Sequence, residues 1–189
     1  MPDRRPPPKR KTHARKVRAP SLVVVNTGDG KGKTTAAMGT ALRAVALGWK
    51  VCVIQFIKSG RWRSGEEQGM RQLGVEWFAT GDGFSWDSKD LDRSAQLAAV
   101  AWAGARDRIS SGDYGLVVLD EVTYPMNWGW VSTEEVVQTI QDRPIHVSVI
   151  VTGRDAPQTL IEAADTVTEM RKVRHAFDRG VVAKRGIDF

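Results

Sequence analysis

Residues 22–35 read Leu22-Val-Val-Val-Asn-Thr-Gly-Asp-Gly-Lys-Gly-Lys-Thr-Thr35, and this stretch decides the fold. A short apolar, mostly β-branched run leads directly into a loop rich in glycine and lysine. The run predicts a buried parallel strand, and the loop would turn its backbone N–H groups and the start of the next helix toward an anion. Lys33 would reach the distal phosphates, and Thr34 would hold Mg²⁺. The stretch therefore predicts a phosphate-binding loop.

The spacing of this loop departs from the common pattern G-x-x-x-x-G-K-[ST]. Counting back from Gly32 and Lys33, the first glycine is expected at position 27, which is Thr27, and Gly28 comes one position late. The context still favours a phosphate loop, because a strand precedes it and an apolar helical stretch over residues 36–47 follows, with Gly48 as its cap. A plain glycine turn between strand and helix is the alternative.

The basic character of the chain is confined to its first 20 residues. These carry eight cationic side chains and one acid, a net +7, whereas the whole chain is +6, so residues 21–189 sum to −1. Five of the eight prolines also lie there, which predicts a disordered tail over residues 1–20 and a single domain over residues 21–189. The folded part has no basic excess, so we do not expect nucleic-acid binding.

The remaining composition limits the class of protein. One cysteine, Cys52, excludes a disulfide framework and a cysteine-based metal site. Neither a signal peptide nor an apolar run of about 18 residues is visible, so we expect a soluble, cytoplasmic protein without a membrane span.

Strands and helices alternate along the rest of the chain. Strands are predicted at residues 51–56, 75–78, 116–121, 146–151 and 166–170. Helices are predicted at residues 66–73, at 91–109 with Trp102 on the buried face, after a capping box of Ser132 and Glu135, and from residues 155–157. Residues 171–189 read as a basic, irregular tail. The alternation predicts an α/β fold, a mostly parallel sheet with helices on both faces.

Two carboxylates end the strand at residues 116–121. Asp120 or Glu121 would face Thr34 across a Mg²⁺ ion if this strand lies beside the phosphate loop. Acidic residues that simply end a strand are the alternative. Without an Asn-Lys-x-Asp guanine signature, the pattern favours ATP. Two loop lysines, Lys31 and Lys33, would suit a triphosphate that leaves whole.

Nine segments in the same order resemble the phosphate-loop type of ATP:corrinoid adenosyltransferase, which acts on cob(I)yrinic acid a,c-diamide or cob(I)alamin in cobalamin biosynthesis. They are residues 27–35, 55–58, 65–66, 80–86, 119–124, 152–154, 164–167, 175–178 and 186–189. The late Gly28 is similar to this family's own loop. The resemblance implies a P-loop NTPase (RecA-like) core and attack by a Co(I) corrinoid on the ribose 5′ carbon of ATP, with release of inorganic triphosphate.

The resemblance also implies roles for individual residues. The catalytic set is Lys33, Phe84, Trp86 and Arg154, and the metal set is Thr34, Glu121 and Asp120. ATP binding is assigned to Thr27, Gly28, Asp29, Gly30, Lys31, Gly32, Lys33, Thr34 and Thr35.

The implied partners are ATP with Mg²⁺, a reduced corrinoid, a second copy in a homodimer, and an electron-donating reductase or flavodoxin-like protein. Two features depart from the family. Asp29 stands where asparagine is usual, which puts that residue's contact in question. The proline-rich tail is not expected to form a complete helical lid.

Two other functions stay open from the residues. A P-loop ATPase or kinase would use the same loop with Glu121 as base and would break a phosphoanhydride bond of ATP instead. A non-catalytic RecA-like module would bind nucleic acid through the basic tail, with steep salt dependence.

Overall fold

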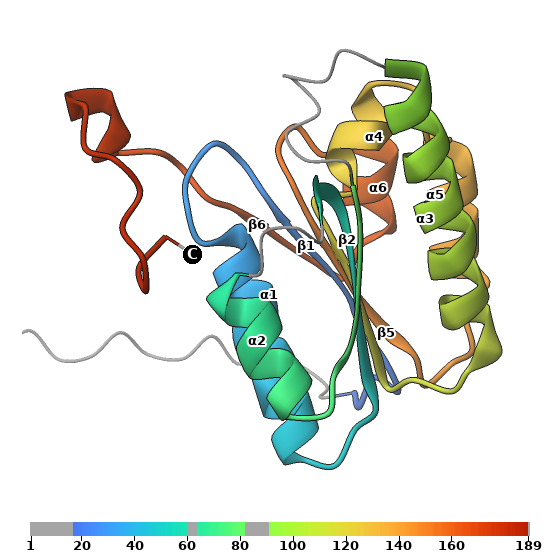
Figure 1. The fold of residues 1–189 in the computed structure, drawn as a ribbon. Coiled ribbons are helices and arrows are strands. Elements are labelled where there is room, and N and C mark those ends of the chain that lie inside the picture. The colour runs from blue at the N-terminus through green and yellow to red at the C-terminus, as the bar shows by residue number, and fades with distance from the viewer. Residues whose placement is uncertain (1–16, 60–63, 82–90, 189) are drawn as a thin grey trace, which may run out of the picture.

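A six-stranded parallel sheet forms the centre of the computed structural model, which describes residues 17–59, 64–81 and 91–188 (Figure 1). The strands are β1 (Val23–Thr27), β2 (Val51–Ser59), β3 (Glu76–Gly81), β4 (Leu116–Asp120), β5 (Ser148–Thr152) and β6 (Thr166–Glu169). Their order in the sheet is β3-β2-β4-β5-β1-β6, and each neighbouring pair is parallel. The carboxyl ends of β1, β4 and β5 therefore meet at one edge.

Helices cover both faces of the sheet. One face carries α1 (Lys33–Ala46) and α2 (Gly65–Gln72); the other carries α3 (Leu91–Ser111), α4 (Thr123–Asn127), α5 (Thr133–Gln141) and α6 (Gln158–Ala163) (Figure 1). A 3₁₀ turn, η2 (Phe177–Arg179), lies in the C-terminal segment. The predicted α/β sheet covered on both faces is confirmed.

The side chains of each central strand point alternately to the two faces of the sheet, so the hydrophobic core has two parts. In β4, Val117 and Leu119 pack with α3 and α5, whereas Leu116 and Val118 pack with α1 and α2. Because successive side chains of a strand point to opposite faces, both sets are buried only when helices cover both sides. Asp120, two residues after Val118, consequently faces the side of α1.

Two local features differ from the sequence expectation. Helix α4, which carries Pro125 in its first turn, was not predicted. The capping box is half formed: the Ser132 hydroxyl accepts from the Glu135 N–H at 3.2 Å, but the Glu135 carboxylate accepts from the Trp102 indole N–H at 3.2 Å. Glu135 thereby satisfies a buried donor of the core instead of closing the reciprocal cap.

The predicted disordered tail over residues 1–20 lies outside the described residues up to position 16. Within the described chain no helix is long and apolar enough to span a membrane. Cys52 is fully buried in β2, as predicted, and this burial raises the pKa of its thiol to about 12.

Candidate active site

The phosphate loop follows β1 and packs against the end of β6. Gly28 and Gly32 have φ of 94° and 107°, a region that only glycine adopts without strain. A Cβ on Gly28 or Gly30 would lie 2.7 or 2.6 Å from the carbonyl oxygen of Met170, to which the Gly30 N–H donates. Glycines are thus required here by a close backbone approach, which fixes the loop on the sheet.

Lys33, the first residue of α1, bends back over this loop. Its ammonium donates to the carbonyl oxygens of Gly28 and Gly30, both at 2.7 Å. Partial burial, and next the nearby Arg154 guanidinium, lower the pKa of Lys33. A group that is cationic, partly desolvated and already held at the loop is suited to bind phosphate oxygens.

Asp120 ends β4 beneath the first turn of α1. Its Oδ1 accepts from the hydroxyls of Thr34 at 2.9 Å and Thr152 at 2.7 Å, and its Oδ2 accepts from the Gln55 amide at 2.8 Å. Asp120 is fully buried. Asp120 therefore contacts Thr34 directly, but β4 is not the neighbour of the phosphate-loop strand that the sequence suggested, because β5 lies between them, and a metal between Thr34 and a carboxylate stays a prediction.

Glu121 follows with a left-handed backbone, φ 64°, which costs a residue with a Cβ about 1 kcal/mol or more. Its N–H donates to the Thr152 hydroxyl at 3.0 Å, which holds this conformation. Burial, followed by the neighbouring Asp120 charge, raises the pKa of the Glu121 carboxyl to about 7. An adjacent cation would favour its ionised form.

Lys33, Thr34 and Glu121 border one pocket of about 480 Å³, and Asp120 lies behind it. The loop, the end of β4 and Arg154 form one wall, which we call the phosphate wall. Residues 171–188 form the other, the C-terminal wall. Together the lining residues are Asp29, Gly30, Lys31, Gly32, Lys33, Thr34, Thr35, Lys58, Glu66, Glu121, Tyr124, Arg154, Lys172, His175, Phe177, Asp178 and Asp188.

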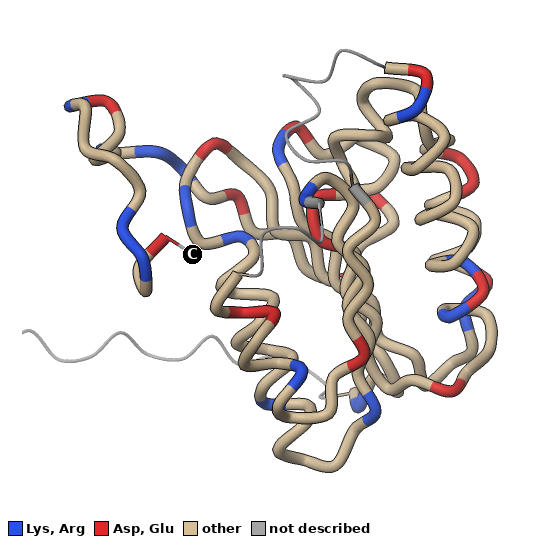
Figure 2. Tube along the Cα trace, in the orientation of Figure 1, with Lys and Arg blue, Asp and Glu red and all other residues tan. Residues whose placement is uncertain are grey.

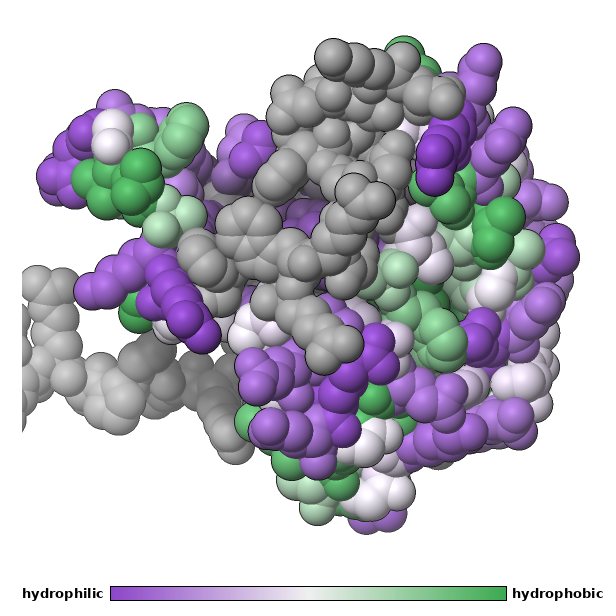
Figure 3. Space-filling view, in the orientation of Figure 1, coloured by the Kyte–Doolittle hydropathy of each residue, from purple (hydrophilic) through white to green (hydrophobic). Residues whose placement is uncertain are grey.

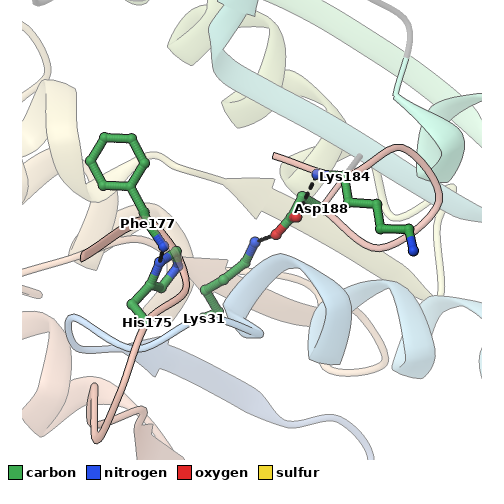
Figure 4. Close-up of polar contacts among 5 residues, drawn as sticks. All are labelled: Lys31, His175, Phe177, Lys184 and Asp188. Atoms are coloured by element: carbon green, nitrogen blue, oxygen red, sulfur yellow. Dashed lines mark hydrogen bonds and ion pairs between the residues drawn. The ribbon is translucent and has the colours of Figure 1, made fainter. Parts of the chain in front are cut away.

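The two walls meet at an ion pair between Lys31 and Asp188 (Figure 4). The Asp188 carboxylate also accepts from the Lys184 N–H at 2.8 Å, and the His175 ring accepts from the Phe177 N–H at 3.0 Å. Figure 2 shows basic residues of the C-terminal segment beside the phosphate loop. Lys31 therefore has a carboxylate partner at the position where a phosphate is expected.

Comparison with known proteins identifies the family. Residues 19–189 match the family described as ATP:corrinoid adenosyltransferase BtuR/CobO/CobP. The chain belongs to this family. It is 44% identical over 168 residues to the corrinoid adenosyltransferase of Escherichia coli K12, covering 89% of this chain and 85% of that one. It is 42% identical, with the same coverage, to the corrinoid adenosyltransferase CobA of Salmonella typhimurium.

A solved structure supports the fold alone. The flagellar accessory protein FlaH of Methanocaldococcus jannaschii superposes with a TM-score of 0.50 at 8% identity, covering 80% of this chain and 71% of that chain. The adenosyltransferase family, in contrast, gives the chemistry: this chain is an enzyme of ATP:corrinoid adenosyl transfer in cobalamin metabolism.

Most of the predicted site residues of this adenosyltransferase line the pocket. Asp29 to Thr35, Glu121 and Arg154 all do so. Three others lie behind it: Gly28 supports the loop, Asp120 holds Thr34, and the Thr27 hydroxyl accepts from the Ala156 N–H at 3.2 Å. Phe84 and Trp86 fall outside the described residues.

Several lining residues were predicted only as members of a strand end or a motif segment and were given no individual role. Lys58 is the next-to-last residue of β2 and Glu66 lies in the first turn of α2, beside the edge where a parallel sheet places its ligand crevice, so the strand pattern carried a signal for them. Tyr124 belongs to the unpredicted α4. The residues of the C-terminal wall follow the last strand in an irregular stretch without periodicity, and only the resemblance over residues 175–178 and 186–189 singled some of them out.

Proposed function

We propose that the pocket binds ATP with its triphosphate on the phosphate wall and its ribose 5′ carbon open to a Co(I) corrinoid. The observation that carries this proposal is the convergence of Lys33, Thr34 and Glu121 on one pocket, in a chain of the adenosyltransferase family. Cobalt supplies the electron pair of the new Co–C bond, and the C5′–O bond breaks. The oxygen keeps that bond's electrons and leaves as part of inorganic triphosphate.

Cations of the pocket would stabilise this leaving group. Lys33 and Lys31 come from the loop, Arg154 follows β5, and Lys58 and Lys172 lie at the pocket rim. Charge that builds on the departing oxygen is stabilised by donors already in place, and removing one such donor costs about 3–4 kcal/mol in comparable sites. Asp29 adds a negative charge here and raises the pKa of Lys33, against the effect of burial.

The residues present fit a magnesium ion. The Thr34 hydroxyl and the Glu121 carboxylate are hard oxygen donors on the pocket surface. No group of three or more His, Cys, Asp or Glu side chains that could hold a metal occurs among the residues the structure describes. Mg²⁺ at this point would take its other ligands from phosphate and water, as it usually does. Bound there, it would neutralise charge on the triphosphate.

The test is a single reaction of the protein with Mg-ATP and chemically reduced corrinoid. We expect a light-sensitive alkylcobalt product and one equivalent of intact triphosphate by phosphorus NMR. ADP with orthophosphate would instead support the phosphoryl-transfer alternative, in which Glu121 acts as base.

Phe84 and Trp86 are proposed to shield the lower face of the corrinoid. An axial ligand makes Co(II) harder to reduce, and aromatic bulk beneath the cobalt would exclude that ligand. Phe84→Ala and Trp86→Ala should slow adenosylation severely from Co(II) with a mild reductant, while pre-reduced Co(I) restores much of the rate. A reductase or flavodoxin-like protein would supply the electron. Loss of ATP affinity in both variants would contradict this role.

A homodimer is proposed from the family and from the surface. The C-terminal segment exposes five large apolar side chains, and Figure 3 shows apolar surface on this projecting segment. They are Val173, Phe177, Val181, Val182 and Ile187. Exposed apolar groups gathered on one segment mark a contact surface. Light scattering should give twice the 20.9 kDa chain mass, and Val182→Asp should shift it toward monomer.

A further inference from the structure

Three adjacent strands carry a polar side chain at the same level of the sheet and on the same face; Asp120 and Thr152 are the last residues of their strands, whereas Gln55 lies in the middle of β2. Gln55 of β2 pairs in register with Asp120 of β4, and Thr152 ends β5 beside them. One step earlier on each strand's α1-facing side lie apolar residues of the core, Val53, Val118 and Ile150. The polar row therefore sits where that core meets the phosphate wall.

This row is buried and internally paired. Gln55, Asp120 and Thr152 are 3%, 0% and 0% exposed. Asp120 accepts from both of the others and from Thr34, and Thr152 accepts from the Glu121 N–H. Of the three residues in the predicted metal set, Thr34 and Glu121 line the pocket, and Asp120 lies behind them.

The direction of each hydrogen bond follows from the groups involved. A carboxylate only accepts, so Thr34, Thr152 and Gln55 all donate to Asp120. The Thr152 hydroxyl donates its single proton to Asp120 and accepts a hydrogen bond from the Glu121 N–H. Thr34 likewise gives its proton to Asp120, which leaves its lone pairs for the pocket. Lone pairs, not the proton, are what a divalent cation requires.

We propose that Gln55 and Thr152 are positioning residues for magnesium. Through Asp120 they fix the rotation of the Thr34 hydroxyl, and Thr152 also holds the left-handed turn that presents Glu121. This inference rests on the proposed function, since it concerns the metal side of that same pocket. Partners one bond behind a metal ligand orient it and affect affinity nearly as strongly as the ligands do.

The experiment measures binding without corrinoid, so no turnover is involved. ATP affinity is determined by calorimetry in Mg²⁺ and in EDTA, and Mn²⁺ binding to the ATP complex is followed by EPR. Thr152→Val removes the hydroxyl at nearly constant volume, and Gln55→Leu removes the amide. Thr152→Ser keeps the hydroxyl. Thr40→Val is the matched control, because the Thr40 hydroxyl donates to the Ala36 carbonyl within α1 and takes no part in the polar row.

We expect Thr152→Val to weaken Mn²⁺ binding and the magnesium-dependent gain in ATP affinity at least about tenfold. Gln55→Leu should weaken both by a smaller factor, Thr152→Ser should restore them, and Thr40→Val should match the parent. ATP affinity in EDTA should stay within about twofold throughout, because the lysine contacts to phosphate are untouched.

Two outcomes would overturn the inference and one would overturn its basis. If Thr152→Val and Gln55→Leu keep the parent's Mn²⁺ affinity and its gain in ATP affinity from Mg²⁺, the row only supplies hydrogen bonds to the buried Asp120 carboxylate. If ATP affinity falls equally in Mg²⁺ and EDTA, the row supports the loop in general and has no specific role toward the metal. If the parent itself gains no affinity from Mg²⁺, the proposed metal site fails, whatever the variants do. Should Thr152→Val not fold, Gln55→Leu still decides between these results.

Discussion

The two walls of the pocket differ in how their polar groups are held. On the phosphate wall, Lys33 bonds two loop carbonyls and Asp120 accepts three hydrogen bonds within the core. On the C-terminal wall, the contacts are partly exposed ion pairs, Lys31–Asp188 and Lys172–Asp178, and several apolar side chains face solvent. The first wall is organised before any ligand arrives. The second has contacts that a ligand or a second copy can replace.

The largest effect is expected from Lys33→Ala on the phosphate wall. Removing this cation takes away a charge-assisted contact to the leaving triphosphate, so kcat/KM should fall at least about a hundredfold. The fold should be kept, because Lys33 contributes no apolar core contact. Steady-state kinetics and circular dichroism measure the two quantities.

Lys50→Ala is the matched control for Lys33→Ala. Lys50 lies at the opposite end of the sheet, with its ammonium 3.2 Å from Glu76 and 4.5 Å from the centre of the Tyr114 ring. Its removal should leave kcat/KM within about twofold of the parent, since surface charges far from a site act weakly. Equal losses in the two variants would mean that Lys33 has no special role.

Gly30→Ala tests whether the phosphate wall is fixed by close packing. A Cβ there would lie 2.6 Å from the Met170 carbonyl oxygen, a backbone atom that cannot turn aside. The loop or β6 must shift, and overpacking of this kind costs about 1–3 kcal/mol. We expect a lower Tm and weaker ATP binding, measured by calorimetry. Gly39→Ala in α1 is the control: its Cβ meets no atom within 4 Å, so this variant should be as stable as the parent or more so.

The same contrast explains what the sequence could predict. The phosphate loop, residues 28–32, lies between a strand and a helix with clear hydrophobic patterns, and β4 is a short apolar run, so the loop and the carboxylates at the end of β4 were located correctly. The sheet order and the approach of β6 to the loop depend on contacts between distant segments and were not predictable. The half-formed cap at Ser132 shows the same limit. The Glu135 carboxylate accepts a hydrogen bond from the indole N–H of Trp102, a residue distant in sequence, and does not close the cap. The roles of Gln55 and Thr152 become visible only when three strands are placed side by side.

Asp188→Asn should have a moderate effect, and in the favourable direction. This change removes the carboxylate partner of Lys31 and a negative charge beside the phosphate site. Exposed ion pairs contribute up to about 1 kcal/mol, so ATP should bind up to about fivefold more tightly. In a double-mutant cycle the gain should be smaller on a Lys31→Ala background, because the part that comes from releasing Lys31 is then absent. Weaker ATP binding in Asp188→Asn would show instead that Asp188 holds the C-terminal wall in the shape that ATP needs.

The smallest effect is expected far from both walls, at the pair Tyr114 and Glu76. The Tyr114 hydroxyl donates to the Glu76 carboxylate at 2.7 Å, and this bond is the main cause that lowers the pKa of Glu76. Because the folded-state pKa is depressed, the bond stabilises the fold above the ordinary pKa of a glutamate, and that contribution is lost as the pH falls through the folded-state value. The phenol, with its pKa raised to about 12, stays a donor throughout this range. Tyr114→Phe should therefore lose slightly less stability than the parent between pH 7 and pH 3 in urea titrations, and its ATP affinity at pH 7 should be unchanged. A change in ATP affinity would mean that a contact at one end of the sheet affects ATP binding at the other. The rigid packing of the phosphate wall would then include the whole length of β2 and β4.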